Sequence, residues 1–153
     1  MTAVIQRVYN ATVYADGVLS GRIDKGLYIL LGVREGDDEE DCRLLADKIS
    51  KLRIFTDEND KMNLSVNDIG GEALVVSNFT LNANYQHGNR PDYLSSAAPD
   101  EANRLYICFL SLMKERVKNV ESGVFGADMR TEMSTNGPVT IVMESSLLKR
   151  GKK

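Results

Sequence analysis

The stretch Ser134-Thr135-Asn136-Gly137-Pro138-Val139-Thr140 sets a Gly-Pro pair directly before an apolar, β-branched run that continues to Met143. Proline has no N–H to give to a sheet ladder, so Pro138 is expected to open a strand or to lie at its edge. Bonds that precede proline are also the ones that become cis at modest cost, and Gly137 lets a ligand approach bare backbone. Taken alone, the stretch is typical of a turn that leads into a strand.

Length and composition are those of an ordinary globular domain. The chain has 153 residues, of which 42% are hydrophobic and 27% charged, and this is enough for one substantial core. No apolar run reaches the length of a membrane span, and the N-terminus lacks the basic-then-apolar pattern of a secretory signal. We therefore expect a cytoplasmic protein with no membrane partner.

Charge is distributed unevenly along the chain. The net charge of −3 argues against a protein that coats nucleic acid nonspecifically. Residues 145–153, however, contain Lys149, Arg150, Lys152 and Lys153 and no acidic residue. We expect residues 1–144 to form a single domain and residues 145–153 to form a flexible basic tail. The tail is either a solubilising end or an arm that contacts phosphates.

Hydrophobic patterns predict an α+β fold in which most strands are antiparallel. Asp16-Gly17 separates two β-rich runs, which is a strong hairpin signal. Residues 27–31 are continuously apolar, as expected of a central strand that is covered on both faces. A further long strand is expected over residues 73–81. Apolar residues at helical spacing near residues 42–52 and 102–117 predict the main helices, and helices set against many short strands favour the α+β class.

The sequence lacks the common signatures of metal and nucleotide chemistry. Cys42 and Cys108 lie far apart on predicted helices and are interpreted as small hydrophobic residues of a reducing compartment. There is no cysteine–histidine metal spacing, no glycine-rich phosphate loop and no Gly-x-Ser-x-Gly elbow. The single histidine, His87, lies in a polar loop and is more typical of an exposed residue than of a catalytic base. We expect neither a metal nor a cofactor.

The polar end of the strand near residue 77 completes a set of motifs that follow one known family in order. These motifs are Ala3-Val4-Ile5-Gln6-Arg7-Val8, Lys61-Met62-Asn63-Leu64-Ser65, Gly71-Glu72-Ala73-Leu74-Val75-Val76-Ser77, Ser77-Asn78-Phe79-Thr80, Arg90-Pro91, Ala97-Ala98-Pro99, Gly123-Val124-Phe125-Gly126-Ala127-Asp128-Met129 and Asn136-Gly137-Pro138-Val139-Thr140. From its first residue to about Glu144, the chain resembles the D-aminoacyl-tRNA deacylases, also called D-tyrosyl-tRNA deacylases. Agreement over this length is far more specific than either short motif.

The resemblance implies a fold, an activity and partners. The expected protein is a homodimer with a barrel-like β core, and its active site is shared across the subunit interface. It hydrolyses the ester between a D-amino acid and the 3′ end of tRNA without a cofactor, so that D-residues do not enter translation. Glycyl-tRNA mischarged on tRNA-Ala is a further expected substrate. DNA has no expected role.

The resemblance also assigns site residues by position. The catalytic pocket for the terminal adenosine and the scissile ester falls on Ser77, Asn78, Phe79 and Thr80. Substrate-binding roles fall on Gly137, Pro138, Met129, Arg7 and Ala98. In this family a Gly-cisPro pair from the partner subunit holds the α-carbon of the substrate by its backbone carbonyls. Arg7 and Met129 match the residues that support this turn.

The chemistry of the motif residues suits these roles, although each has an ordinary alternative. Backbone N–H groups at Phe79 and Thr80 are placed to form an oxyanion hole. Phe79 is suited to stack on adenine, or else it is a core aromatic. The Thr80 hydroxyl resembles a nucleophile, but it needs a base and the chain offers no histidine close in sequence. Thr80 is alternatively an ordinary strand residue.

Two positions depart from the family pattern and keep other functions open. The family usually has glutamine in place of Asn78 and asparagine in place of Thr135. A Thr-Asn-Gly-Pro order occurs in a related branch with a trans Gly-Pro bond, which removes a small L-amino acid such as alanine from mischarged tRNA. The D-specific branch is favoured instead by Ser77, Phe79 and Val139 and by the run over residues 123–129. A non-catalytic RNA-binding module and an amidohydrolase with a threonine nucleophile are the remaining alternatives.

Overall fold

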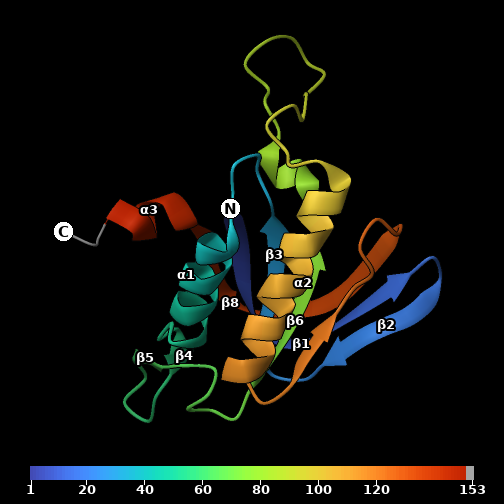
Figure 1. The fold of residues 1–153 in the computed structure, drawn as a ribbon. Coiled ribbons are helices and arrows are strands. Elements are labelled where there is room, and N and C mark those ends of the chain that lie inside the picture. Colours follow the sequence, from blue (N-terminus) through green and yellow to red (C-terminus); the bar gives the residue numbers. More distant parts are fainter. Residues whose placement is uncertain (151–153) are drawn as a thin grey trace.

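A computed structural model describes residues 1–150 and shows a curved β-sheet with two long helices, α1 and α2, packed against it (Figure 1). In chain order the elements are β1 (Thr2–Ala15), β2 (Val18–Ile23), β3 (Gly26–Gly32), α1 (Glu39–Ser50), β4 (Phe55–Thr56), β5 (Met62–Leu64), β6 (Glu72–Ser77), the 3₁₀ helix η1 (Phe79–Asn82), α2 (Pro99–Arg116), β7 (Val120–Ser122), β8 (Met129–Glu144) and α3 (Ser145–Arg150). The predicted α+β class is confirmed.

The long strand β1 organises the sheet. It pairs with β8 over most of its length, and on its other side it pairs first with β3 and then with β2. These three pairings are antiparallel, whereas β3–β6 and β6–β7 are parallel. Parallel neighbours need long crossovers. These are supplied by α1 with the β4–β5 hairpin, and by α2. The sheet is therefore more mixed than the hydrophobic patterns predict.

The sheet curls until its two ends meet. Ser20 Oγ of β2 donates a hydrogen bond of 2.8 Å to the carbonyl oxygen of Ser122 on β7. Gly21 makes this approach possible, because a Cβ at that position would lie only 3.0 Å from the same carbonyl oxygen. The result is a nearly closed, barrel-like sheet with a small apolar interior that includes Val13 and Leu74.

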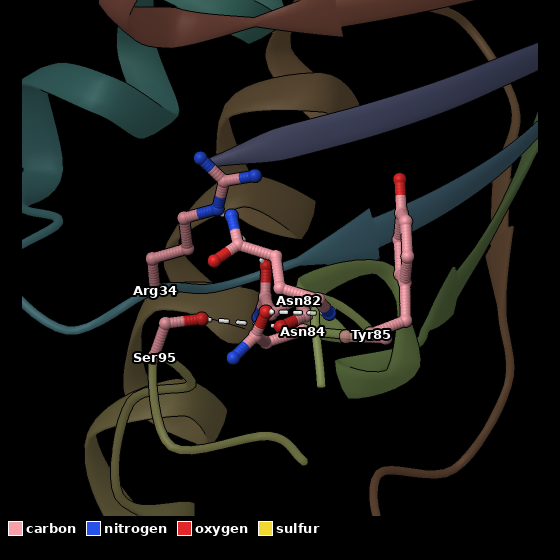
Figure 2. Close-up of a pocket in the computed structure, with 7 residues that line it drawn as sticks. Arg34, Asn82, Asn84, Tyr85 and Ser95 are labelled. Carbon is pink, nitrogen blue, oxygen red and sulfur yellow. Dashed lines mark hydrogen bonds between the residues drawn. The ribbon is translucent and has the colours of Figure 1, made fainter. Parts of the chain in front are cut away.

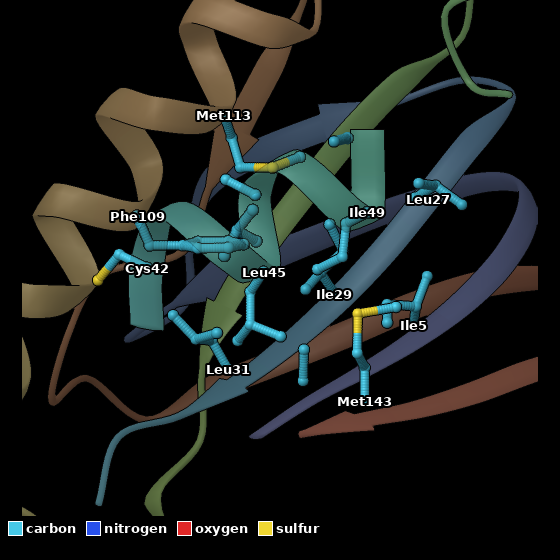
Figure 3. Packing of buried hydrophobic residues seen from close by; sticks show 14 of the residues in the cluster. Ile5, Leu27, Ile29, Leu31, Cys42, Leu45, Ile49, Phe109, Met113 and Met143 are labelled. Carbon is cyan, nitrogen blue, oxygen red and sulfur yellow. The ribbon is translucent and has the colours of Figure 1, made fainter. Parts of the chain in front are cut away.

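The main core lies between the sheet and the two long helices (Figure 3). Leu45 and Ile49 of α1 and Phe109 and Met113 of α2 are fully buried and pack with Leu31 of β3. The four helix residues lie at the helical spacing that the sequence shows. Burying each one stabilises the fold by about 1.5–3 kcal/mol.

The two cysteines join this core at the α1–α2 contact. Both are free thiols; Cys42 is buried and Cys108 is half-buried. The Cys42 thiol donates to the carbonyl oxygen of Leu105 at 3.3 Å. Burial, with smaller contributions from Cys108 and nearby acids, raises the pKa of Cys42. The interpretation of Cys42 as a small buried residue is confirmed. No helix within residues 1–150 is long and apolar enough to cross a membrane.

Residues 145–150, which we expected to belong to a flexible tail, form α3 beside the start of α1. The backbone N–H of Ser145 donates to the carbonyl oxygen of Met1 at 3.0 Å. Lys149 Nζ lies 2.9 Å from Asp41 Oδ2 and 3.6 Å from Asp38 Oδ1. The positive charge of α3 therefore meets the acidic first turn of α1. The remainder of the basic tail, residues 151–153, lies outside the described residues.

Asp41 is expected to make the stability of the protein fall in acid. Burial alone would raise the pKa of this carboxyl, but hydrogen bonds from Ser145, Lys149 and Asp38 outweigh it and lower the pKa to about 2. The folded pKa lies below the unfolded value, so the stabilisation is complete above about pH 5 and is lost progressively as the pH falls toward 2. Its size is about 2 kcal/mol.

Denaturant unfolding at pH 7 and pH 3 measures this contribution. Asp41→Asn should be less stable than wild type at pH 7, and its stability should fall less between the two pH values. Glu58→Gln, which alters an exposed carboxylate, serves as the control and should follow wild type. Parallel pH dependences for wild type and Asp41→Asn would contradict the assignment.

Candidate active site

A cavity of about 1010 Å³ opens at the carboxyl ends of the parallel strands β3 and β6. All four residues of the Ser77-Asn78-Phe79-Thr80 motif line it. Ala98, which precedes α2, and Met129, which begins β8, line it as well. The fold thus brings six of the nine expected site residues to one cavity.

The motif ends strand β6 and begins η1. The backbone N–H of Asn78 donates to the carbonyl oxygen of Leu31 at 2.8 Å, which fixes the motif to β3. The Asn78 side chain then caps η1, because its Oδ1 accepts the backbone N–H of Thr80 at 3.2 Å. The strand therefore ends at Ser77. The apolar pattern predicts a strand that continues to residue 81, and this prediction is wrong.

Phe79 is an exposed aromatic at the mouth of the cavity. Its side chain is 59% exposed, and its ring meets that of Tyr93 edge to face with centroids 5.0 Å apart. The alternative that Phe79 is a core aromatic is therefore wrong. Its backbone N–H has no hydrogen-bond partner within residues 1–150. Of the two donors expected for an oxyanion hole, the Phe79 N–H is open, whereas the Thr80 N–H is held by Asn78.

Thr80 lacks the setting of an activated nucleophile. Its hydroxyl donates to Asn78 Oδ1, and an amide oxygen is too weak a base to take the proton. Among the described residues that line the cavity, Asp128 is the only charged one. Thr80 also lies in η1, so the alternative of an ordinary strand residue is wrong.

The Gly137-Pro138 turn is held by a buried arginine. Arg7 Nη1 donates to the carbonyl oxygen of Ile54 at 2.8 Å, and its Nε donates to that of Asn136 at 3.1 Å. Arg7 Nη2 also lies 3.3 Å from Asn136 Oδ1. The Gly137-Pro138 bond is cis, whereas the L-alanyl alternative expects a trans bond. Asn136, to which the family resemblance assigns no role of its own, supports the turn through its backbone and side-chain oxygens.

Comparison with known proteins places this geometry in a family. The model of the family described as "D-Tyr-tRNA(Tyr) deacylase" matches residues 4–144. The chain belongs to this family. Its members are hydrolases that act on the ester bond of aminoacyl-tRNA, and membership confirms the expected enzyme class.

Relatives of this deacylase extend over nearly the whole chain. A protein of Clostridium botulinum named D-aminoacyl-tRNA deacylase is 47% identical over 146 residues, covering 95% of this chain and 98% of its own. One of Caldicellulosiruptor saccharolyticus with the same name is 50% identical over 145 residues, covering 95% of this chain and 97% of its own.

Two solved structures share the deacylase fold. One, described as "c-Myc DNA Unwinding Element Binding Protein", has a TM-score of 0.88 and 36% identity and covers 94% of this chain and 98% of its own. The other, described as a probable eukaryotic D-amino acid tRNA deacylase, has a TM-score of 0.79 and 16% identity and covers 94% of this chain and 100% of its own. At that identity it shows the fold alone.

Within one deacylase chain, the Gly-Pro turn and the cavity are separate. Neither Gly137, Pro138 nor Arg7 lines the cavity. Arg7 pairs with Leu27 near the start of β3, whereas Ser77 pairs with Leu31 near its end. Four residues along a strand span about 13 Å. A single chain therefore does not place its own Gly-Pro turn over its own motif.

Proposed function

We propose that this deacylase hydrolyses D-aminoacyl-tRNA to a free D-amino acid and tRNA, with the terminal adenosine and the ester bound in the cavity at Phe79. The observation that carries the proposal is the exposed Phe79 ring beside an open backbone N–H, at the mouth of a cavity lined by the whole motif. Aromatic stacking on a base contributes roughly 1–3 kcal/mol. The ring thereby places the adjoining ester near the Phe79 N–H.

The protein contributes orientation and charge stabilisation to the reaction. Water adds to the ester carbonyl, and the tetrahedral intermediate carries a negative oxygen that the Phe79 N–H can bind. An aminoacyl ester is already activated, and the 2′-OH of the terminal ribose assists the attack of water. A fixed ester and a fixed donor then suffice. No metal or cofactor has a part in this scheme.

The proposed site is completed by a second copy of the chain. Gly137 and Pro138 of the partner subunit would close the cavity and exclude an L side chain by collision with their backbone carbonyls. The separation of turn and cavity within one chain supports this arrangement. Val142 on β8 and Tyr9 on β1 expose large apolar side chains, 67% and 57% respectively, on the strands that carry the turn and its arginine. Such exposed apolar groups suit a subunit interface.

Substrate scope follows from this mode of selection. A backbone wall that rejects an L side chain does not sense which D side chain is present, so we expect broad tolerance of D-amino acids. Glycine has no side chain to reject, so glycyl-tRNA mischarged on tRNA-Ala is a further proposed substrate. We assign tRNA as the partner, give DNA no role, and retain the cytoplasm as the proposed location.

Release of tyrosine from D-Tyr-tRNA by the purified protein tests the proposed function. We expect turnover well above the spontaneous rate, and Phe79→Ala should raise KM because the adenine loses its stacking partner. If the ester is hydrolysed only at the spontaneous rate, the proposed function is wrong and the alternative of a non-catalytic RNA-binding module remains. Activity on free amides would instead favour an amidohydrolase.

A mixed dimer tests the shared site. Each proposed site combines Phe79 of one subunit with Gly137 of the other. Made alone, Phe79→Ala should therefore impair the motif half of both sites, and Gly137→Ala should impair the turn half of both. Co-expression with two different tags allows the mixed dimer to be purified, and one of its two sites then has both halves intact. The mixed dimer should exceed the activity of both parent variants. Full activity of a wild-type monomer at high dilution, or an inactive mixed dimer, would contradict the shared site.

A further inference from the structure

A second, smaller cavity opens at the C-terminal end of η1. It encloses about 230 Å³ and is lined by polar and aromatic side chains, among them Arg34, Asn82, Asn84, Tyr85, Gln86 and Ser95. Figure 2 shows Arg34 and Tyr85 on opposite sides, with Asn82 and Asn84 between them. No acidic residue is among the described residues that line this cavity.

Arg34 brings a positive charge with unused donors to this cavity. Its Nε donates to Asn82 Oδ1 at 3.3 Å. Its Nη2 lies 4.0 Å from Glu144 Oε1, which is too long for a hydrogen bond. A guanidinium has five N–H donors in a planar fork that matches phosphate oxygens. Most of these donors therefore remain available to an anion.

Hydrogen bonds fix Asn82 and the loop that carries Tyr85. Asn82 is 3% exposed, and its Nδ2 donates to the carbonyl oxygen of Val33 at 2.9 Å and to Ser96 Oγ at 3.2 Å. Backbone bonds of 2.8 and 2.9 Å between Asn84 and Asp92 close the loop that carries Tyr85. Asn82 and the backbone of this loop are therefore held in place.

The opposite wall presents an aromatic ring and an amide to the solvent. Tyr85 is 79% exposed, and the next residue, Gln86, also lines the cavity. An arginine for the phosphate, an aromatic ring for the base and an amide such as Gln86 for the base edge are groups with which proteins bind single-stranded RNA. The chemistry of the cavity matches one nucleotide.

We propose that this second cavity binds the nucleotide that precedes the terminal adenosine of the tRNA, with Arg34 on its phosphodiester and Tyr85 stacked on its base. The inference rests on the proposed function, which places the terminal adenosine in the first cavity. Helix η1 forms a wall of both cavities: Phe79 lines the first and Asn82 the second. A 3₁₀ helix rises about 2.0 Å per residue, so these residues lie about 6 Å apart along its axis. That distance suits a single nucleotide step.

Substrates of two lengths test the proposal. Arg34→Gln should raise KM for D-Tyr-tRNA about tenfold, as expected for one lost charge-assisted hydrogen bond, and leave kcat unchanged. It should not alter the hydrolysis of D-tyrosyl adenosine, which lacks the preceding nucleotide. Tyr85→Ala should show the same selectivity, and Tyr85→Phe should restore wild-type KM. Arg43→Gln is the matched control, because both arginine side chains are 41% exposed and both substitutions remove one positive charge.

The outcomes separate this inference from the proposed function. If the wild-type protein hydrolyses neither substrate, the proposed function is wrong. Suppose instead that wild type hydrolyses both substrates. If Arg34→Gln then impairs both reactions equally, Arg34 only supports Asn82; if it impairs neither reaction, Arg34 is inert. Either result means that the inference is wrong. Binding of a non-hydrolysable 3′-D-tyrosylamino adenosine, with and without a 5′-linked cytidine, gives a second measurement. Wild type should gain affinity from the added nucleotide, Arg34→Gln should not, and an equal gain in both would contradict the proposal.

Discussion

Thr80→Ala is expected to retain deacylation within about tenfold of wild type, roughly 1.4 kcal/mol in the activation free energy. D-Tyr-tRNA whose terminal ribose lacks the 2′-OH should instead be hydrolysed at least about a hundredfold more slowly, the low end of the range for a lost proton-transfer group. The Thr80 hydroxyl donates to the amide oxygen of Asn78, which cannot activate it. The open Phe79 N–H belongs to the backbone and survives the substitution.

Single-turnover rates with both substrates measure these two effects. Thr80→Ser, which keeps the hydroxyl, should match wild type. Affinity for the 2′-deoxy substrate should stay close to normal, so that its defect is in kcat. A covalent acyl group trapped on Thr80, or a loss of several orders of magnitude in Thr80→Ala, would restore a nucleophilic mechanism.

Gly137→Ala is expected to reduce hydrolysis of D-Tyr-tRNA by about a hundredfold, the usual cost of misplacing a reactive centre by about 1 Å. Gly137 has φ +133°, and a Cβ there would lie 2.6 Å from the backbone nitrogen of Val139. Something in the turn must therefore shift. Because the backbone carbonyls of this turn are the proposed selector, the ratio of D to L rates should fall as well.

Gly70→Ala provides the matched control for Gly137→Ala. Gly70 also has a positive φ, +62°, but a Cβ there meets nothing within 4 Å. Both variants carry backbone strain, and only Gly137→Ala disturbs the turn. Steady-state rates on D-Tyr-tRNA, with circular dichroism to confirm folding, should separate them. A wild-type rate and D/L ratio in folded Gly137→Ala would remove the turn from the mechanism.

The local pattern of the sequence predicts much of the fold. The Asp16-Gly17 signal marks the β1–β2 turn, and residues 27–31 fall within the central strand β3. The continuity of β1 was not predicted. The sequence indicates two strands, over residues 3–8 and 11–15, but the structure has one continuous strand with register shifts on either side of Val8. The hydrophobic pattern also does not predict that β3, β6 and β7 are parallel, because the crossover connections between the strands determine their direction.

The sequence predicts only some residues of the candidate site, and there is a physical reason for this. The resemblance finds residues whose side chains or conformations are distinctive, such as Phe79 and Gly137. It does not find Ile54, because any residue supplies the carbonyl oxygen that Arg7 binds there. Arg34 and Tyr85 lie far apart in sequence and share no motif. Only the folded chain shows that they line one cavity.

The central claim is that this chain removes D-amino acids from tRNA and spares L-amino acids. Its most direct test measures the hydrolysis rates of D-Tyr-tRNA and L-Tyr-tRNA, prepared on the same tRNA, with the wild-type protein. The account predicts rapid release of D-tyrosine and release of L-tyrosine at no more than the spontaneous rate. Equal rates on the two esters, or a preference for the L ester, would contradict it.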